Sequence, residues 1–410
     1  MTLNHVSEIK VSLRFDQTPL PVGRLAIREG VIYFQYDEPF LARNLEISPF
    51  HLPLQPNLKR FDRALFEGLP GVFNDSLPDG WGRLVFDRFM RTQGILPVQL
   101  SPLDCLTYVG SSGMGALVYE PHHEEIHTKG PLNLDTLARH AHHLLEGEAE
   151  KVLAELLDLN GSSAGARPKA MIGVNKTRQK IIHGAHELEA GFDPWLVKFA
   201  NAQDGSDAGA IEYVYSLMAK DAGLPMMDTH LFLGKKGAGY FASKRFDRGQ
   251  DTRLHVHTAC GLLHSDFRIP SLDYEDLLAL TQHLTRDVRE VKKMFRLAVF
   301  NVLSHNRDDH GKNFSFLMDA NGQWRLAPPY DLTFSSGPYG EHSTTIMGNG
   351  TAPTFSDLLK LGESAGLNSK EMAPLIQEVQ DSLQNWRSLA SKYGVRKSTI
   401  ALIESKLNKG

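Results

Sequence analysis

An apolar helical run that ends abruptly in a dense cluster of charge constrains this 410-residue chain more than any other feature. The run "MFRLAVFNVL" (294–303) has the spacing of a buried helix, and "SHNRDDHGKNFSF" (304–316) follows it without a linker. Nine residues of this cluster contain two adjacent carboxylates, two imidazoles, two carboxamides and a lysine. Charged groups are costly to bury beside a core, so any assignment of function has to explain this cluster.

Composition excludes several classes of protein. The 44 basic and 48 acidic side chains give a net charge of −4, so no global cationic field is available to bind nucleic acid. Cys105 and Cys260 are far apart and form no CxxC pair, which favours a reducing compartment over a disulfide scaffold or a structural zinc site. No run of about 18 apolar residues and no apolar leader occurs. We therefore expect a cytoplasmic protein without a membrane segment.

The first third of the chain has strand patterns, and the last third has helical ones. In "EIKVSLRF" (8–15) apolar and polar residues alternate, and "VGRLAIREGVIYFQY" (22–36) predicts a hairpin around Gly30. From about residue 270 onward the apolar spacing is helical. We predict an α+β fold with three parts: a β-rich N-terminal subdomain (1–130), an α/β lobe (131–250) and an all-helical C-terminal lobe (251–410).

The spacing of acids and amides in the charged cluster matches the needs of phosphoryl transfer. That reaction requires a base beside the attacking hydroxyl and oxygen ligands that hold Mg²⁺ against phosphates. Asp308 and Asn313 reproduce a D-x4-N spacing, and Asp331 follows eighteen residues later. The intervening segment predicts a hairpin with Asn321-Gly322 at its turn. This hairpin would bring Asp331 back beside Asn313.

The D-x4-N spacing alone is equally consistent with a charged helix end followed by an Asn-Gly turn. Two further features favour a functional site. Lys198 lies in the apolar strand-like segment "PWLVKFA", where an unpaired lysine is costly, and Glu212 on the next predicted helix is a candidate partner. The small residues of "GSSAGARPKA" (161–170) allow backbone N–H groups to approach phosphates, although this is no Walker A sequence.

Seven motifs, in this order, resemble the HipA family of bacterial serine/threonine kinase toxins. They span nearly the whole chain: "LPDGWGR" (77–83), "GMGALVYEP" (113–121), "SSAGARPK" (162–169), "LVKF" (196–199), "RFDR" (245–248), "NRDDHGKN" (306–313) and "PPYDL" (328–332). The resemblance implies a HipA-like kinase fold in which residues 131–250 form the ATP lobe. It also implies ATP and Mg²⁺ as cofactors.

The resemblance assigns roles to individual residues. Asp308 would be the catalytic base, Asn313 and Asp331 the Mg²⁺ ligands, and Glu212 the partner of Lys198. The "SKRFDR" segment would hold adenine through backbone groups near Lys244 and Phe246, with Asp247 on the ribose side. The full set of ATP contacts would be Lys198, Ala164, Gly165, Ala166, Lys244, Phe246, Asp247, His310 and Lys312.

The family also implies regulation and partners. Ser162 matches the family's autophosphorylated loop serine, and Ser163 is a second candidate. A phosphate of about −1.5 to −2 charges in a phosphate-binding loop would disfavour ATP. The expected partner is a small helix-turn-helix antitoxin of the HipB type, through which alone DNA would be contacted. The expected protein substrate is an aminoacyl-tRNA synthetase.

Some features depart from the family pattern. Asp309 is a second acid beside the predicted base, which raises local repulsion and the demand for metal. Lys312 stands four residues after that base, whereas eukaryotic kinases have the lysine two residues after it. "RLHVHTACGLLH" (253–264) has histidines where the pattern would place an acidic pair.

Two rival functions remain open. His305 and His310 flank the aspartates, which would suit a metal-dependent nuclease or phosphohydrolase, but a clear third histidine ligand is missing. Elsewhere, "HHEEIH" (122–127) and the pair His140 and His143 are more typical of solvated surface than of metal sites. The other rival is a catalytically silent partner of a DNA-binding antitoxin, against which the intact set of acids and lysine argues.

Overall fold

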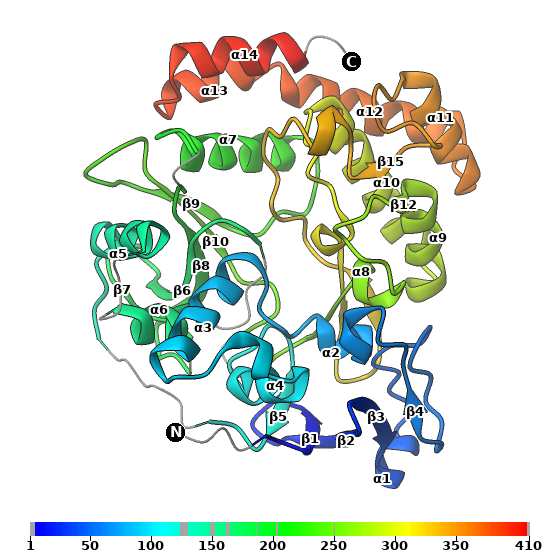
Figure 1. Cartoon of the computed structure of the whole chain (residues 1–410). Coiled ribbons are helices and arrows are strands. Elements are labelled where there is room, and N and C mark those ends of the chain that lie inside the picture. Colours follow the sequence, from blue (N-terminus) through cyan, green and yellow to red (C-terminus); the bar gives the residue numbers. More distant parts are fainter. Residues whose placement is uncertain are drawn as a thin grey trace.

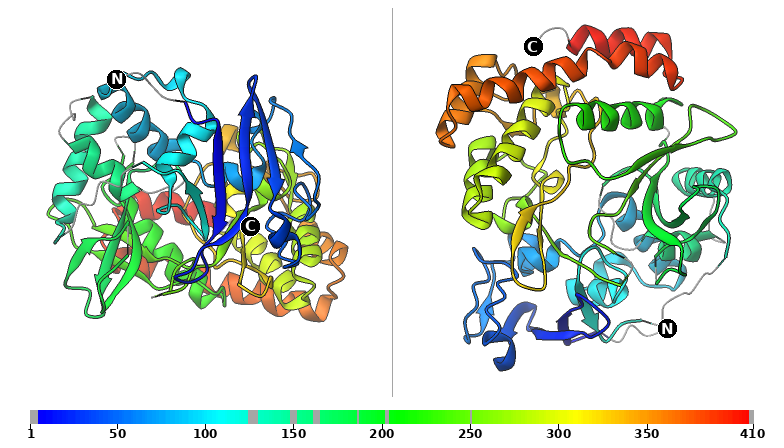
Figure 2. Two further views of the ribbon diagram at one scale, coloured as in Figure 1. Left: turned by 90° about the horizontal axis from the view of Figure 1, so that it is seen from below. Right: turned by 180° about the vertical axis from the view of Figure 1, so that it is seen from behind.

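The computed structural model describes residues 5–123, 130–147, 152–160, 165–185, 187–201, 204–249 and 251–407. They form a mixed α+β fold, which confirms the predicted class (Figure 1). In Figure 1 and in the right view of Figure 2 the last helices of the chain lie at the opposite end of the molecule from the first strands. The predicted boundaries at residues 130 and 250 stay predictions.

The N-terminal part is an antiparallel sheet in the order β4-β3-β2-β1-β5. Its strands are β1 (Glu8–Leu13), β2 (Leu20–Arg28), β3 (Val31–Tyr36), β4 (Lys59–Arg60) and β5 (Leu117–Glu120). In β1 the side chains of Ile9, Val11 and Leu13 are buried, because alternate residues of a strand face the same side. Both the strand predicted at 8–15 and the hairpin predicted at 22–36 are confirmed.

Short helices join and cover this sheet. They are α1 (Glu38–Leu41), α2 (Gly71–Asn74), α3 (Gly80–Thr92) and α4 (Pro102–Val109), with 3-10 turns at Phe66–Gly68 and Pro97–Gln99. Helix α3 buries an apolar stripe that begins at Trp81 and ends at Met90. Trp81 belongs to a core cluster with residues of α5 (Leu134–Glu146) and α6 (Leu153–Asn160), which lie between the two large sheets in the sequence.

The central part is a second antiparallel sheet in the order β7-β6-β8-β10-β9. Its strands are β6 (Lys169–Asn175), β7 (Ile181–His183), β8 (Phe192–Lys198), β9 (Thr229–Phe232) and β10 (Tyr240–Lys244). Helix α7 (Ala208–Asp221) follows β8 directly. The register of β6 and β8 places Lys169 opposite Lys198, so two lysines lie side by side at one end of this sheet.

The C-terminal part is mainly helical. Its helices are α8 (Ala259–Leu262), α9 (Tyr274–Thr285), α10 (Val288–Leu303), α11 (Phe355–Ser364), α12 (Ser369–Leu383), α13 (Trp386–Lys392) and α14 (Lys397–Leu407). With α7 they enclose the largest buried apolar cluster among the described residues. The helical pattern at 369–394 divides into two helices, because the chain turns at Gln384 and Asn385.

One detail differs from the expectation of an all-helical lobe. β11 (His255–Thr258), β13 (Ser315–Met318) and β14 (Trp324–Leu326) form a three-stranded sheet, and β12 (Leu272–Asp273) pairs with β15 (Thr344–Thr345). The strands β13 and β14 are the hairpin that the Asn-Gly turn predicted. Met318 of β13 belongs to the buried apolar cluster of the N-terminal sheet, so this small sheet packs against the N-terminal part.

A polar network also joins the N-terminal part to β11. The buried carboxylate of Asp75 accepts hydrogen bonds from the backbone N–H and the hydroxyl of Thr258, both at 2.8 Å, and lies 2.6 Å from Nδ1 of His257. Nε2 of His257 is 3.0 Å from the hydroxyl of Ser48. The histidines that replace the expected acidic pair are therefore interior hydrogen-bonding groups that hold the two parts together.

No helix within these described ranges combines the length and the apolarity needed to cross a membrane.

Replacing Asp75 with alanine tests this junction. The change leaves the buried donors of His257 and Thr258 without their acceptor, and each such loss costs about 1–3 kcal/mol. We expect the free energy of unfolding in urea to fall by roughly 3 kcal/mol. The exposed Asp221→Asn at the end of α7 should change it by less than about 0.5 kcal/mol. Equal effects of the two changes would contradict a structural role for Asp75.

Candidate active site

The charged cluster begins where α10 is closed by its own polar residues. His305 adopts a left-handed φ of 58°, and the backbone N–H of Asn306 reaches back to the carbonyl of Asn301 at 2.9 Å. This is the hydrogen bond that ends many helices at a left-handed residue. The Asn306 side chain also donates to the side-chain oxygen of Asn301 at 2.9 Å. The hydroxyl of Tyr215 in α7 binds the carbonyl of Ser304 at 2.7 Å, so the helix end is fixed before the acids begin.

Asp309 is the residue that holds the rest of the cluster in place. Its Oδ2 accepts from the hydroxyl of Tyr274 at 2.9 Å and lies 2.8 Å from Nδ1 of His342. Its Oδ1 accepts from the backbone N–H of Ser343 at 2.8 Å. Burial, reinforced by Asp309, raises the pKa of Tyr274 well above its usual range, which keeps this phenol a donor.

These contacts correct the expectation for Asp309. The carboxylate is buried and hydrogen-bonded on both oxygens, so these oxygens are bound by protein donors and are not left open for a metal. Its function in the loop is structural. The contacts tie the segment after Asp331 to the segment that carries Asp308.

Asp308, by contrast, faces outward. Its side chain is 60% exposed, and Nε2 of His310 lies 4.0 Å from its Oδ1. Asn313 donates from Nδ2 to the backbone carbonyl of Asp308 at 2.5 Å, so both ends of the D-x4-N spacing meet. The ring of Phe267 lies 5.2 Å from that of His310. An accessible carboxylate on a fixed backbone is suited to take a proton from a bound hydroxyl.

Lys198 is held between two acids. Its Nζ donates to Glu212 Oε1 at 2.5 Å and to Asp331 Oδ1. Burial alone would raise the pKa of Asp331, but Lys198 and then Lys169 outweigh it and hold that pKa far below its usual range. Burial likewise opposes the charge on Lys198, and Asp331 and Glu212 outweigh it, so the pKa of Lys198 is raised. Lys198 and Asp331 therefore remain charged.

The hairpin β13–β14 brings Asp331 back to the cluster, as predicted. The residue before it, Tyr330, donates its hydroxyl to the backbone carbonyl of Lys312 at 2.6 Å, next to Asn313. Asp331 adopts a left-handed φ of 57°. Such a conformation is uncommon for a residue with a side chain and is concentrated at functional sites. Asp331 therefore lies next to the loop that carries Asp308 and Asn313.

Two cations of this site were missed by sequence reasoning. Lys169 begins β6 and is buried opposite Lys198, and burial lowers its pKa to about 8. Arg167 lies 3.3 Å from Glu212 and 3.1 Å from Asp204. Both belong to the segment "ARPK", where two cations directly before a strand were the available signal.

A third residue that the sequence did not single out is Asp79, just before α3. Its Oδ1 accepts from the backbone N–H of Gly165 at 2.6 Å, and its Oδ2 accepts from Nζ of Lys312. Lys312 also lies 4.8 Å from the ring centre of Phe267. The N-terminal part therefore contributes a side chain to the edge of the site.

The predicted adenine-binding segment gives a mixed result. Phe246 lies beside Tyr330, with ring centres 5.6 Å apart, and Lys244 forms a 3.0 Å ion pair with Asp193. Asp247 differs from the expectation, because its carboxylate is fully buried, is bound by Arg245 at 2.6 and 2.9 Å, and accepts from Gly115 N–H at 2.8 Å. Burial opposes its charge, but Arg245 outweighs burial and the pKa is about 2. These contacts are structural and do not support a place for Asp247 on the ribose side.

Part of the predicted phosphate-binding loop lies outside the described residues, namely Ser162, Ser163 and Ala164. Gly165 and Ala166 are described, and Gly165 has a φ of 102°. A Cβ at Gly165 would lie 2.6 Å from Nζ of Lys169, and the φ of 102° is a backbone conformation that favours glycine.

The rival metal readings find little support among the described residues. His305 turns away from the acids, with Nδ1 3.2 Å from the carbonyl of Ser335 and its ring stacked on Phe334. His140 lies 3.4 Å from Glu155 on α6. No group of three or more histidine, cysteine, aspartate or glutamate side chains within the described residues is placed to hold a metal ion. The "HHEEIH" tract lies partly outside them.

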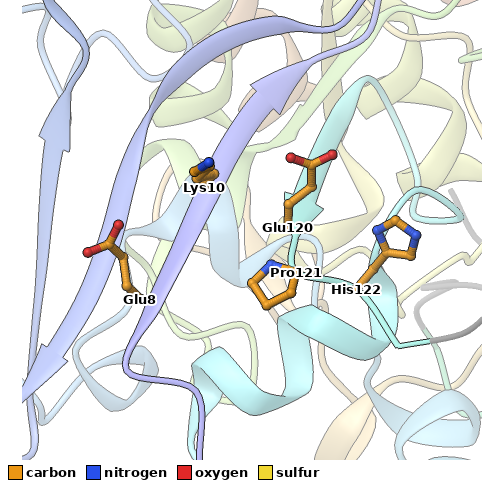
Figure 3. A pocket seen from close by; sticks show the side chains of 5 residues that line it. All are labelled: Glu8, Lys10, Glu120, Pro121 and His122. Atoms are coloured by element: carbon orange, nitrogen blue, oxygen red, sulfur yellow. The ribbon is translucent and has the colours of Figure 1, made fainter.

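A shallow depression of about 470 Å³ lies on the N-terminal sheet, away from these residues (Figure 3). It is lined by Glu8, Lys10, Glu120, Pro121 and His122. Among the described residues, none of these five side chains forms a hydrogen bond or ion pair with the acids and lysines described above, and the depression is open to solvent. We do not assign the function of the protein to it.

Kinase-like sites combine three features: a buried lysine paired with an acid on the next helix, an aspartate–asparagine loop, and a second aspartate. The fold and the site thus define a kinase-like class of protein. Residues 161–386 match the model of the HipA-like C-terminal domain, and residues 16–120 match that of the HipA N-terminal domain. The chain belongs to the HipA family, which confirms the resemblance seen in the seven motifs.

Individual relatives agree with this assignment. A putative kinase of Haemophilus influenzae is 27% identical over 207 residues, which cover 41% of this chain and 60% of that protein. The serine/threonine-protein kinase toxin HipA of Shewanella oneidensis is 30% identical over 103 residues, or 25% of this chain and 22% of that protein. The chain thus matches less than two thirds of the length of each of these relatives.

Among solved structures, the chain is similar to that of the Shewanella oneidensis toxin–antitoxin system of HipA, HipB and operator DNA. The TM-score is 0.69 at 16% identity, with 97% of this chain and 95% of that chain covered. At this level of identity the likeness shows that the fold is shared over nearly the whole chain.

The two adjacent aspartates provide a matched test of the site's construction. Asp309→Asn places an amide donor against the donors of Tyr274 and His342, so we expect it to lower the free energy of unfolding by about 1–3 kcal/mol. Asp308→Asn changes an exposed group and should alter that free energy by less than about 0.5 kcal/mol. Urea denaturation of both variants measures the difference. Equal stability would mean that the Asp309 contacts do not hold the loop.

Proposed function

We propose that this protein is an ATP- and Mg²⁺-dependent protein serine/threonine kinase and the toxin of a type II toxin–antitoxin pair. The observation that carries the proposal is Lys198, held between Glu212 and Asp331 beside the loop of Asp308 and Asn313. A lysine paired with an acid on the next helix, beside an aspartate–asparagine loop, is the arrangement that protein kinases use to hold nucleotide phosphates. Membership of the HipA family supports the same reading.

The residues present can perform the steps of phosphoryl transfer. Lys198 places a positive charge at the phosphate oxygens and orients them. Asp308 accepts the proton of the substrate hydroxyl as its oxygen bonds to the γ-phosphorus, while the bond from that phosphorus to the bridging oxygen breaks and ADP leaves. The 60% exposure of the Asp308 side chain gives a protein hydroxyl room to reach it. His310 lies beside this carboxylate and orients the loop.

The donor chemistry of Asn313 and Asp331 fits Mg²⁺. Carboxylate and carboxamide oxygens are the hard ligands that this ion prefers. Asp331 stays ionised because of Lys198 and Lys169, and Asn313 uses its NH₂ group for Asp308, which leaves its carbonyl oxygen for a metal. When bound, the ion would neutralise charge on the β- and γ-phosphates.

The remaining ATP contacts follow the family pattern. Gly165 and Ala166, with Ala164 before them, would provide backbone N–H groups to the phosphates, and Lys312 would add charge. Backbone groups near Lys244 and Phe246 would hold adenine. Autophosphorylation of Ser162 or Ser163 would add about −1.5 to −2 charges to the phosphate-binding loop and so reduce ATP binding.

The proposed partners are a HipB-like helix-turn-helix antitoxin and, only through it, operator DNA. The solved Shewanella oneidensis structure contains HipA, HipB and operator DNA together, and this chain shares that HipA fold. The net charge of −4 favours DNA binding by the partner rather than by this chain. The proposed substrate class, an aminoacyl-tRNA synthetase, rests on the family alone.

Asp308→Asn tests the proposed chemistry. We expect phosphoryl transfer from radiolabelled ATP to fall by about 10²–10⁴-fold, because the base is lost. Asp331→Asn should cost at least as much, because the phosphates lose a metal ligand and Lys198 loses a partner. Intact-mass measurement should show one added phosphate on the wild type, mapped to Ser162 or Ser163, and none on Asp308→Asn. The exposed Asp381→Asn in α12 serves as the control and should be unchanged.

Two outcomes would contradict the proposal. Phosphodiester cleavage that requires zinc and survives Asp308→Asn would favour the hydrolase. ATP binding without transfer by the wild type to itself or to any protein in a phosphoproteomic comparison would favour the catalytically silent partner. Phosphoproteomics after controlled expression also names the substrate if the kinase reading holds.

A further inference from the structure

Asp79 occupies the N-cap position of α3, yet its side chain makes no capping hydrogen bond to that helix. An aspartate at this position commonly accepts a hydrogen bond from the first turn of its own helix. Here it makes no such bond. Its two carboxylate oxygens instead bind Gly165 N–H at 2.6 Å and the Lys312 ammonium group. Because this carboxylate does not cap its own helix, its contacts with Gly165 and Lys312 indicate a different structural role.

The residues after Asp79 are shaped for the same contact. Trp81 donates its backbone N–H to the carbonyl of Gly165 at 2.9 Å, so both polar backbone groups of Gly165 are bound by the start of α3. Gly80 has a φ of 47°, and a Cβ there would lie 2.5 Å from the Gly165 carbonyl oxygen. Only glycine allows this approach. Three successive residues of the N-terminal part therefore fit one residue of the central part.

Lys312 provides the link to the catalytic loop. It lies one residue before Asn313, its side chain is 8% exposed, and its ammonium group lies 4.8 Å from the ring centre of Phe267. Asp79 is similarly enclosed, with 14% of its side chain exposed. The pair therefore exchanges little with water, and its geometry is much more restricted than that of a surface ion pair.

We propose that Asp79 is a positioning residue of the kinase site, which fixes the spacing between the phosphate-binding segment at Gly165 and the catalytic loop at Lys312. This proposal rests on the proposed kinase function. It makes the N-terminal part a component of the active site, although Asp79 touches no reacting atom. Asp79 contacts both segments, so its carboxylate connects them.

The two halves of the connection can be broken separately. Asp79→Asn keeps an oxygen for Gly165 N–H but removes the charge opposite Lys312. Asp79→Ala removes both contacts. We therefore expect Asp79→Asn to lower kcat about 10²-fold with a nearly unchanged KM for ATP, since misplacement of a catalytic group by about 1 Å costs that much. Asp79→Ala should lower kcat similarly and also raise the KM for ATP by about tenfold or more.

Lys312→Met breaks the same pair from the other side. If Asp79 acts on the catalytic loop through Lys312, the double variant Asp79→Asn/Lys312→Met should lose no more activity than the worse single variant. A multiplicative loss in the double variant would overturn the proposal. Asp87→Asn is the matched control, because Asp87 lies on the same helix and pairs with Arg83 at 2.6 Å without contacting the site. It should retain wild-type kcat and KM.

A second measurement does not depend on catalysis. In the full-length Asp308→Asn chain, which cannot change its own phosphorylation state, hydrogen exchange at Gly165 N–H should be slow and should accelerate at least tenfold when Asp79→Ala is added. Unchanged exchange would overturn the proposed role of the Asp79–Gly165 hydrogen bond. If the wild type shows no phosphoryl transfer but this exchange result holds, the kinase proposal fails and the contact stands. If transfer is present and Asp79→Asn stays within threefold of wild type, the positioning role fails and the kinase proposal stands.

Discussion

The buried carboxylate of Asp309 is the interaction on which the geometry of the site depends. A carboxylate is stable in the interior only if its oxygens are hydrogen-bonded. Here the donors come from α9, through Tyr274, and from the segment around Ser343. Asp308, Asn313 and the backbone around them cannot shift without losing those bonds. The chemistry attributed to Asp308 therefore depends on an acid that takes no part in it.

The second constraint is the balance of charge around Lys198. A partly buried region contains four basic side chains and four acidic ones. The basic residues are Lys169, Lys198, Arg167 and Lys312, and the acidic residues are Asp331, Glu212, Asp204 and Asp79. Removing one member leaves a buried partner uncompensated, which is more costly than the pair is worth. These charges are already paired in the structure, so the proposed binding of anionic phosphates would require little further ordering of them.

The sequence predicted those parts of the protein that depend on local pattern. Alternation identified β1, apolar spacing identified α10, and the Asn-Gly turn identified the hairpin that returns Asp331. The sequence could not predict which carboxylates are buried. Asp309 and Asp247 are surrounded in the sequence by polar and charged residues, a pattern that predicts exposed loop positions. Their burial is decided by Ser343 and by Gly115, which is 132 residues away from Asp247. The role of Asp79 likewise depends on a contact between positions 79 and 312, which no local pattern encodes.

The difference in burial between the exposed Asp308 side chain and the buried Asp309 side chain follows from the backbone between α10 and Asn313. After the left-handed turn at His305 the chain has no helical structure up to His310, which has an extended φ of −78° and ψ of 164°. In an extended chain successive side chains face opposite sides. One of two neighbouring acids must then face the core when the other faces outward. Burial of the inner carboxylate is stable because Tyr274 and His342 hydrogen-bond to it. A core-like helix can thus run directly into a charged cluster, since the cluster's inner acid fixes the loop and its outer acid is left free to react.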